Sequence, residues 1–320
     1  MYGPLRLLLL FLAIALTGCV SINLPSVQPL AEKVVAGEGK AKILLVDISG
    51  IIKDEESANI FGISKPNLTA RIKEELDLAA KDDDVKAVVL RINTPGGSVT
   101  TSDIISHEIE NFKKKRKVPV VAELMDMAAS GGYYIASSAD RIIAHPTTVT
   151  GSIGVIAISV SASGLMEKIG ITNQTIKSGP LKDMGSPLKP MTEEERKIIQ
   201  SVIDGMYERF LDRVAAGRPN MHTRDELTKI ADGRVYTAAQ AKDLKLIDSI
   251  GYLDDAIEWA KQAAGVKEAR VVTYAQPRAY KNNIYSRAEA APAGINIINI
   301  EAGIPIPKTA GMEFMYIWLP

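Results

Sequence analysis

Short aliphatic segments alternate with segments of helical periodicity over the first half of the sequence. Aliphatic runs of this length are typical of buried strands, and the helical stretches between them can supply the crossover connections of a parallel sheet. Aromatic residues make up only 5% of a chain whose hydrophobic fraction is 46%, so the core must be mainly aliphatic. The expected strands are 42–47, 85–91, 118–123, 141–144, 154–159 and 171–176, and the expected helices are 68–80 and 101–115. This alternation predicts an α/β fold.

The C-terminal part of the sequence is mainly helical in pattern. Thr192 and Glu195 have the spacing of a capping box, which predicts a helix that runs to about Ala216. The segment 276–309 is rich in Pro, Ala and Gly and is expected to be irregular. The apolar end, 312–320, is expected to pack on the domain or on a neighbouring subunit, and contact with a membrane surface is the alternative. Further helices are expected at 224–230, 238–244 and 254–263.

The charges of the chain balance. Lys and Arg total 38, as do Asp and Glu, so the formal net charge is zero. Proteins that bind nucleic acid usually carry a basic excess, and we therefore expect no nucleic-acid partner. No cluster of histidine and cysteine suggests zinc, and neither a metal nor an organic cofactor is expected.

The N-terminus has the pattern of a secretory signal. One basic residue, Arg6, precedes an apolar run at 7–16, which is shorter than the roughly 20 residues of a membrane span but suits the core of a signal peptide. The next residues, Leu-Thr-Gly-Cys at 16–19, resemble the bacterial lipobox, in which cleavage leaves a lipid-modified Cys19. An uncleaved signal anchor is the alternative. Both interpretations place the rest of the chain outside the cytoplasm, on a membrane surface.

A glycine-rich turn follows the second expected strand. Between Arg91 and Ser98 the chain contains Pro95, Gly96 and Gly97. A Pro-Gly-Gly turn leaves backbone N–H groups free to face a ligand. Such a loop could bind an oxyanion, a phosphate or a thioester carbonyl, although a plain turn is its commoner role.

One serine, Ser130, lies among small residues. Ala128 and Ala129 precede it, and Gly131 and Gly132 follow it. A helix is expected to begin here after a strand, and the amides of a helix N-terminus favour developing negative charge. Ser130 is therefore a candidate nucleophile, and a plain helix N-cap is the alternative.

The base that would activate this serine is harder to identify. His107 lies inside an expected helix, His145 precedes Pro146 at a strand end, and His222 lies in a polar region, so no histidine has supporting context. A lysine can activate a serine if burial lowers its pKa from about 10.4 toward neutrality. Lys182 lies in a loop bounded by glycine and proline. Most lysines are solvated surface charges, however, and the residues alone do not select this one.

Taken together, these segments resemble the signal peptide peptidase A family of serine proteases. The resemblance covers about 43–260 and implies an α/β, Clp protease/crotonase-like fold of repeated β-β-α units with a helical C-terminal extension. The motifs that carry it are, in order, Asn93-Thr94-Pro95-Gly96-Gly97, Ala129–Tyr134, Thr150–Val155, Ser178-Gly179 with Lys182-Asp183 and Ser186-Pro187, Asp232–Tyr236, and Leu246–Asp248 with Gly251. The expected divisions are a signal peptide at 1–18, a tether at 19–40, a Ser-Lys peptidase domain at 41–265, and a C-terminal strand and irregular tail at 266–320.

The resemblance implies a role for each matched site residue. Ser130 would be the nucleophile and Lys182 the general base. The backbone N–H groups of Gly97 and Gly131 would form the oxyanion hole, and Ser152 would orient the lysine amine.

The resemblance also implies partners and a location. In this family the serine and lysine of one site come from neighbouring domains or subunits, so a chain with one copy of each implies a homo-oligomer. Substrates would be cleaved signal peptides and other apolar peptides at the extracytoplasmic face of a bacterial membrane. Two features depart from the family: Thr94 stands where serine is usual, and the lipid expected on Cys19 replaces the membrane-spanning anchor of many members.

Two other functions remain open for such a fold. A catalytically inactive lipoprotein scaffold would leave Ser130 unreactive toward serine-directed probes. A crotonase-type acyl-CoA enzyme fits the glycine-rich turn, but an extracytoplasmic location would deprive it of CoA thioesters.

Overall fold

The computed structural model describes residues 29–54, 57–58, 64–65, 67–219, 223–276, 283–285 and 313–319. The expected signal peptide, Cys19 and His222 lie outside these ranges, as does most of the segment expected to be irregular. Within the described ranges, no helix is both long enough and apolar enough to cross a membrane.

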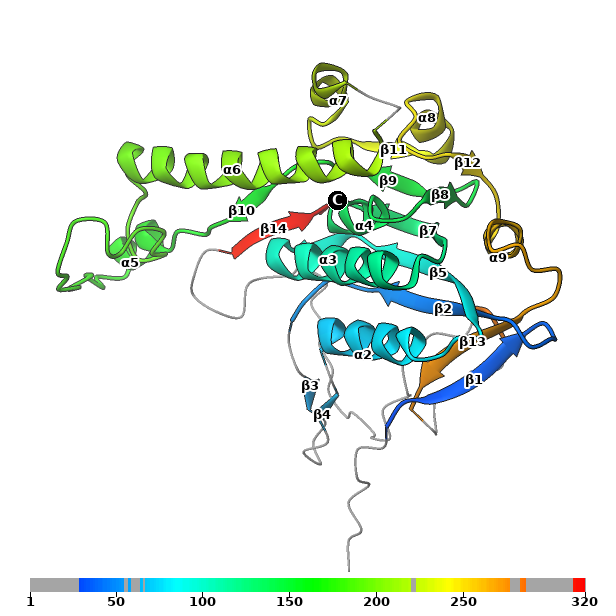
Figure 1. The fold of residues 1–320 in the computed structure, drawn as a ribbon. Coiled ribbons are helices and arrows are strands. Elements are labelled where there is room, and N and C mark those ends of the chain that lie inside the picture. Colours follow the sequence, from blue (N-terminus) through cyan, green and yellow to red (C-terminus); the bar gives the residue numbers. More distant parts are fainter. Residues whose placement is uncertain are drawn as a thin grey trace, which may run out of the picture.

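A nine-stranded sheet runs through the centre of the molecule (Figure 1). Its strands are β1 (Ala31–Ala36), β2 (Lys42–Ser49), β5 (Val85–Thr94), β7 (Val120–Ala129), β8 (Arg141–Ala144), β9 (Val149–Gly151), β11 (Val235–Thr237), β12 (Ser249–Ile250) and β13 (Arg270–Ala275). The main path has the order β1-β13-β2-β5-β7-β8-β12, while β9 pairs with β7 and β11 with β9. From β13 to β12 the pairs of the main path are parallel, and β1 is antiparallel to β13. The parallel centre confirms the α/β class.

Helices cover both faces of this sheet. One face carries α2 (Leu68–Ala80), α3 (Val99–Arg116) and α4 (Gly131–Ala136), and the other carries α9 (Leu253–Ala263) (Figure 1). Successive residues of a strand point to opposite faces. Leu44 therefore packs in the same cluster as Ile72 of α2 and Ile105 of α3, whereas Ile43 packs with Leu253 of α9.

The helical extension contains α5 (Ser163–Lys168), α6 (Glu193–Gly217), α7 (Arg224–Ile230) and α8 (Ala238–Asp243). The long helix α6 crosses the upper part of the molecule, and α5 projects beyond its N-terminal end (Figure 1). The capping box predicted for α6 is confirmed. The Glu195 N–H donates to Thr192 Oγ1 at 3.2 Å, and the Thr192 N–H donates to Glu195 Oε2 at 2.9 Å.

Two smaller sheets complete the described fold. One joins β6 (Gly96–Ser98), β10 (Ile156–Ile158) and β14 (Glu313–Ile317) in the order β10-β14-β6, with both pairs antiparallel. The other joins β3 (Ser57–Ala58) to β4 (Ser64–Lys65). The apolar C-terminal end thus packs on the domain, which was one of the two arrangements expected from the sequence.

Two expectations about local structure were wrong. Segment 171–176 forms no strand, although it was expected to. Its residues are exposed, with Ile176 99% exposed, because the segment belongs to the part of the chain near α5 that projects away from the central sheet (Figure 1). Conversely, residues 31–36 form β1, although they fall in the expected tether, because β13 offers them an edge for antiparallel pairing.

A carboxylic acid is buried on the α9 face of the sheet. Glu123 of β7 lies in register with Arg91 of β5, is fully buried, and has no hydrogen-bond partner for either carboxyl oxygen among the described residues. The Arg91 Nε donates instead to Asp47 Oδ1 at 2.9 Å. Burial, with a smaller contribution from the Asp255 carboxylate, raises the pKa of Glu123 to about 9. Glu123 is therefore neutral at pH 7.

Substituting Glu123→Gln should remove a pH-dependent loss of stability. A carboxyl whose pKa is higher in the folded than in the unfolded chain, where it is about 4.3, stabilises the fold at low pH and loses this contribution as the pH rises toward the folded-state value. Between pH 5 and pH 8 the free energy of unfolding should shift in favour of the variant by at least about 1 kcal/mol. Urea denaturation at both pH values measures this shift, and parallel pH profiles for the two proteins would contradict it.

Candidate active site

Ser130 lies at the junction of β7 and α4, in an unusual backbone conformation. The strand ends at Ala129, the helix begins at Gly131, and Ser130 between them has φ 52° and ψ −113°. A positive φ is uncommon for any residue other than glycine and costs roughly 1–3 kcal/mol. The Ser130 N–H donates to the Gly151 carbonyl at 2.8 Å, which ties the junction to β9.

The Ser130 hydroxyl is buried without a partner. The residue is 1% exposed, and Oγ has no hydrogen-bond partner among the described residues. It makes no capping hydrogen bond to α4, unlike Asn67 and Thr192, whose side chains cap α2 and α6. The structure therefore gives no support to the plain N-cap alternative. An unpaired buried hydroxyl costs roughly 1–3 kcal/mol and calls for a functional explanation.

The glycine-rich turn lies directly against this junction. A Cβ on Gly96 would come within 2.9 Å of the Gly131 N, and a Cβ on Gly97 would come within 2.1 Å of the Ile52 carbonyl oxygen. A Cβ on Gly131 would lie 2.5 Å from Ser102 Oγ. The structure thus brings together the two segments that carry the predicted oxyanion donors, Gly97 and Gly131, at an approach that only glycine permits.

Thr94 holds the glycine-rich turn in shape. It is 1% exposed, and its Oγ1 accepts a hydrogen bond from the Gly96 N–H at 3.0 Å. A serine hydroxyl could accept the same bond, so the departure from the family at this position keeps the polar contact.

Ser152 directly follows β9, as Ser130 directly follows the neighbouring strand β7. Ala129 and Gly151 are register partners of β7 and β9, so the residues that follow them, Ser130 and Ser152, leave the sheet next to each other. Ser152 also has a positive φ, 50°, and its N–H donates to the Arg234 carbonyl at 2.8 Å. The role expected of Ser152, which is to orient the Lys182 amine, stays a prediction.

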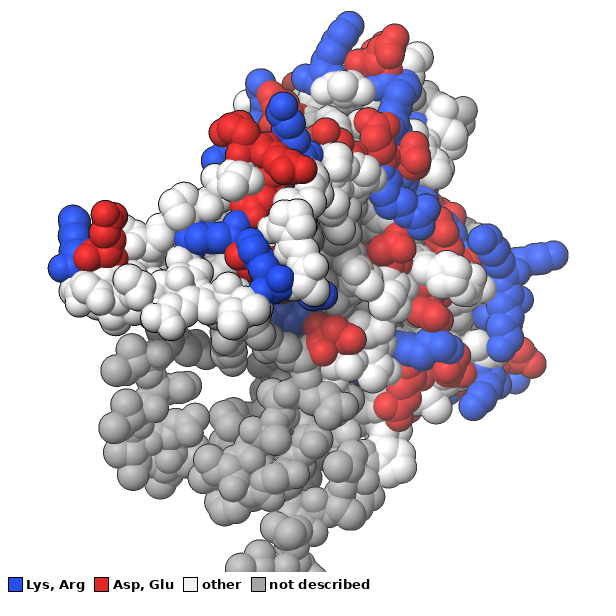
Figure 2. All heavy atoms as spheres, turned by 90° about the vertical axis from the view of Figure 1, so that its left-hand side faces the viewer, with Lys and Arg blue, Asp and Glu red and all other residues white. Residues whose placement is uncertain are grey.

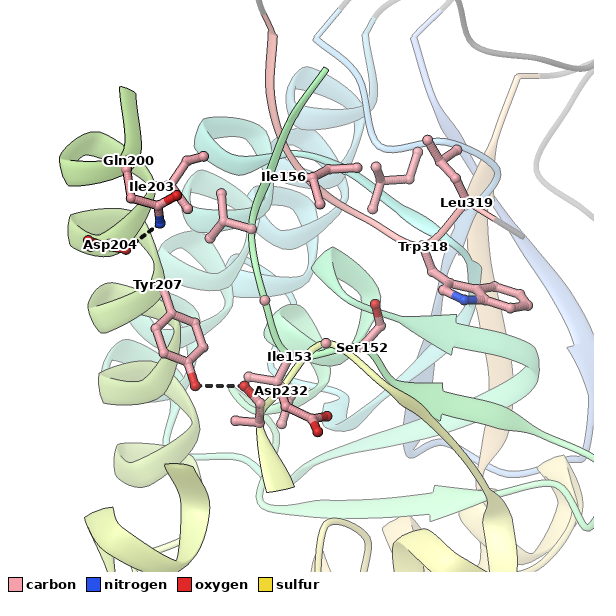
Figure 3. Close-up of a pocket in the computed structure, with 15 residues that line it drawn as sticks. Ser152, Ile153, Ile156, Gln200, Ile203, Asp204, Tyr207, Asp232, Trp318 and Leu319 are labelled. Carbon is pink, nitrogen blue, oxygen red and sulfur yellow. Dashed lines mark hydrogen bonds between the residues drawn. The ribbon is translucent and has the colours of Figure 1, made fainter. Parts of the chain in front are cut away.

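Ser152 opens into a cavity of about 470 Å³. The cavity lies between α6, the chain from Ser152 to Ile156, the loop at 231–233 and the end of β14 (Figure 3). One wall is held by Tyr207, whose hydroxyl donates to the Ala231 carbonyl at 2.6 Å. Two carboxylates, those of Asp204 and Asp232, also line the cavity.

Lys182 is not buried within one chain. It is exposed, and it belongs to the segment between α5 and α6 that projects away from the sheet (Figure 1). The adjacent Asp183 carboxylate is bound by Lys177 at 2.6 Å and faces Lys189 at 3.5 Å. The Lys177 hydrogen bond is the main reason that the pKa of Asp183 lies below its usual range. A single chain thus lacks the burial that a lysine base needs.

Neither described histidine is hydrogen-bonded to Ser130, because the Ser130 hydroxyl has no hydrogen-bond partner among the described residues. His107 belongs to α3, and His145 forms an edge contact with Tyr252 at 4.9 Å and a hydrogen bond to Thr147 Oγ1 at 2.8 Å. His145 thus has the structural role suggested by its position at a strand end.

The sequence offered no sign of how closely β14 approaches Ser130. β14 pairs with β6 on one side and β10 on the other, and the Tyr316 carbonyl oxygen lies against Gly96 and Gly131. The only signal was the apolar and aromatic composition of 312–320, which predicts packing but not register.

A family model and several curated relatives indicate the family of this chain. A family model described as peptidase family S49 matches residues 112–267. The Enterococcus faecium protein named for signal peptide peptidase SppA is 39% identical over 259 residues, which cover 81% of this chain and 74% of that protein. The chloroplastic serine protease SPPA of Arabidopsis thaliana is 35% identical over 215 residues, which cover 66% of this chain and 31% of that protein. Among solved structures, a ClpP1 mutant from Listeria monocytogenes aligns over 67% of this chain and 94% of that chain, at 19% identity and a TM-score of 0.42.

Substituting Thr94→Val should loosen the glycine-rich turn, whereas Thr94→Ser should preserve it. Valine has nearly the shape of threonine but cannot accept the Gly96 N–H, and a buried donor left unpaired costs roughly 1–3 kcal/mol. The free energy of unfolding should fall by this amount in Thr94→Val and by less in Thr94→Ser. Denaturant titration of both variants measures the difference, and equal losses would show that the hydroxyl is not what holds the turn.

Proposed function

Because this chain belongs to the signal peptide peptidase A family, peptidase family S49, we propose that it is a membrane-associated endopeptidase that uses a Ser130–Lys182 dyad. The relatives support a serine-type protease, and the α/β sheet with its helical C-terminal extension fits the Clp protease/crotonase-like fold expected from the sequence. The proposed substrates are cleaved signal peptides and other apolar peptides at the extracytoplasmic membrane face.

The observation that carries this proposal is the state of Ser130. Its hydroxyl is buried, unpartnered and held at a positive φ next to two glycine-rich segments. Strain and an unsatisfied polar group at one residue are typical of a catalytic position. A serine with a purely structural role would be stabilised by a hydrogen bond to its hydroxyl, for example by capping α4.

The proposed reaction is acyl transfer to serine. Ser130 Oγ attacks the carbonyl carbon of the scissile peptide, and its proton passes to the neutral Lys182 amine. The N–H groups of Gly97 and Gly131 stabilise the oxyanion, and donors of this kind each lower the barrier by roughly 3 kcal/mol. The lysine then returns the proton to the leaving amine, and water deprotonated by the same lysine hydrolyses the acyl-enzyme.

We further propose that Lys182 reaches Ser130 of a neighbouring subunit. A lysine needs burial to be neutral, and the cavity beside Ser152 is a place where an amine from another chain could be buried. The segment that carries Lys182 projects from the molecule, and Figure 2 looks onto this side, where uncharged surface adjoins charges of both signs. The projecting part exposes aliphatic side chains, as expected of a surface that packs against another copy. These side chains are Val160, Leu165, Ile169, Ile171 and Ile176.

Mixing inactive variants tests the shared site. Ser130→Ala and Lys182→Ala should each abolish cleavage of an apolar fluorogenic peptide, since either change removes one half of the dyad. If one site draws on two subunits, oligomers assembled from both variants contain sites with an intact pair. Co-refolding the two variants should therefore restore a substantial fraction of wild-type activity.

The control for this experiment is Lys242→Ala, which removes an exposed lysine of α8 and should leave the rate unchanged. Activity retained in purified Lys182→Ala would show that another group is the base. Absence of activity in the mixture, with both parents inactive and folded, would place the dyad within one chain. An inactive wild type whose Ser130 also resists a serine-directed probe would favour the lipoprotein scaffold.

The proposed anchor is a lipid on Cys19. Mass spectrometry of the membrane-bound protein should find a mature N-terminus at Cys19 that carries acyl chains, because a thiol at this position is the acceptor in a lipobox. Cys19→Ser should abolish acylation. An N-terminal peptide that begins at Met1 or Tyr2 would instead identify an uncleaved signal anchor.

A further inference from the structure

Strand β7 contains a bulge shortly before it reaches Ser130. The register of β7 against β5 shifts between Ile92 and Thr94. Asn93, the residue between them, faces the three residues 125–127 of β7. A bulge bends its strand and re-aims the side chains that follow it, and bulges are common beside active sites for this reason. The contacts that hold this bulge in shape therefore also determine where Ser130 lies.

The Asn93 side chain bridges the bulge. Its Oδ1 accepts the Met127 N–H at 3.2 Å, and its Nδ2 donates to Asp126 Oδ2 at 3.3 Å. The amide thus uses its acceptor and its donor on two successive residues of β7. The backbone of Asn93 is itself fixed, because its carbonyl accepts the Gly50 N–H at 3.0 Å. The Asn93 bridge is therefore anchored in the sheet on the side of β2 and β5.

Thr148 holds the same bulge from the opposite side. It directly precedes β9 and is 1% exposed. Its Oγ1 donates to the Leu124 carbonyl at 2.7 Å and also lies within hydrogen-bond distance of the Met125 carbonyl. The bulge is thus bound by one side chain from each side, and β5, β7 and β9 are joined where they approach the proposed site (Figure 1).

The Asn93 bridge connects the two chain segments that carry the proposed catalytic groups. Gly97, a proposed oxyanion donor, lies four residues after Asn93. Ser130 lies three residues after Met127. Because both connections are short, a change in the distance between Asn93 and Met127 would move the serine relative to the glycine-rich turn. Displacements of about 1 Å between reacting groups can lower a rate by about a hundredfold.

We propose that Asn93 is a positioning residue of the active site, and that its bridge across the bulge of β7 fixes the placement of Ser130 relative to the Gly97 N–H. This inference rests on the proposed function of Ser130, because it assigns a role in the same reaction. The bridge needs one acceptor and one donor on a short side chain, and the asparagine amide supplies both. An aspartate here would keep the acceptor but would place a second carboxylate against that of Asp126.

Exchanging the two side chains tests the bridge. In Asn93→Asp the two carboxylates repel each other, so kcat for an apolar fluorogenic peptide should fall by about tenfold or more. KM should change by less than about twofold, since the bridge acts on the reacting groups and not on substrate binding. Adding Asp126→Asn to Asn93→Asp reverses donor and acceptor across the same gap, and should restore kcat to within about threefold of the wild type. Asp126→Asn alone keeps an oxygen that can accept the Asn93 N–H, and should have only a small effect.

The matched control is Asn111→Asp, which makes the same chemical change at an exposed position of α3 and should leave kcat and KM unchanged. The free energy of unfolding of each variant is measured by denaturant titration alongside the kinetics. An exchange that restores stability without restoring kcat would overturn the inference, as would wild-type kcat in Asn93→Asp. If Asn93→Asp does not fold, Asn93→Ser, which lacks the bridge but adds no charge, takes its place with the same expected loss of kcat.

Amide hydrogen exchange separates failure of this inference from failure of the proposed function. It is measured in Ser130→Ala, because it needs no catalysis. Adding Asn93→Asp should speed exchange of the Met127 N–H by about tenfold, and adding Asp126→Asn as well should restore its protection. This result together with an inactive wild type would support the bridge and overturn the proposed protease. Unchanged protection of the Met127 N–H in Asn93→Asp, or an active enzyme whose kcat does not respond to Asn93, would overturn the inference.

Discussion

The hydrogen bond from the Ser130 N–H to the Gly151 carbonyl is the contact on which the geometry of the site depends. At 2.8 Å it joins the ends of β7 and β9 where both strands leave the sheet. It holds Ser130 at a positive φ that an isolated segment would avoid, and it places Ser152 next to it. A second bond, from the Ser152 N–H to the Arg234 carbonyl, fixes the other side of the junction. Ser130, the proposed nucleophile, is thus positioned by the backbone of the sheet.

Backbone contacts of glycine complete this arrangement. Gly96, Gly97 and Gly131 lie so close to neighbouring backbone or side-chain atoms that a Cβ on any of them would overlap. Close approach of this kind lets amide groups point at one place without intervening side chains, which is what stabilisation of an oxyanion requires. The same closeness lets β14 pair with β6 across Gly96 and Gly97. The same glycines therefore shape the proposed oxyanion hole and the contact of β6 with the C-terminal strand.

The two halves of the proposed dyad differ in how the chain holds them. Ser130 is buried at the edge of a rigid parallel sheet, whereas Lys182 is exposed on a segment that projects beside α5. A rigid nucleophile and a projecting base suit a site completed by assembly, because the second subunit would supply both the amine and its burial. Within one chain, Ser130 is held by the strands around it, whereas Lys182 has no comparable burial.

The sequence by itself determined the local elements and the chemical candidates. Helix α2 and strand β8 have the bounds that periodicity predicts, and the Thr192 capping box starts α6 as expected, because these features depend on neighbours along the chain. The strand predicted at 171–176 is absent, because composition does not reveal whether another strand lies close enough to pair with the segment. Only the tertiary structure decided that Ser130 meets Gly151, that β14 pairs with β6 and β10, and that Lys182 is not buried within its own chain. Each of these depends on contacts between distant parts of the chain, and such contacts leave no periodic signal in a single sequence.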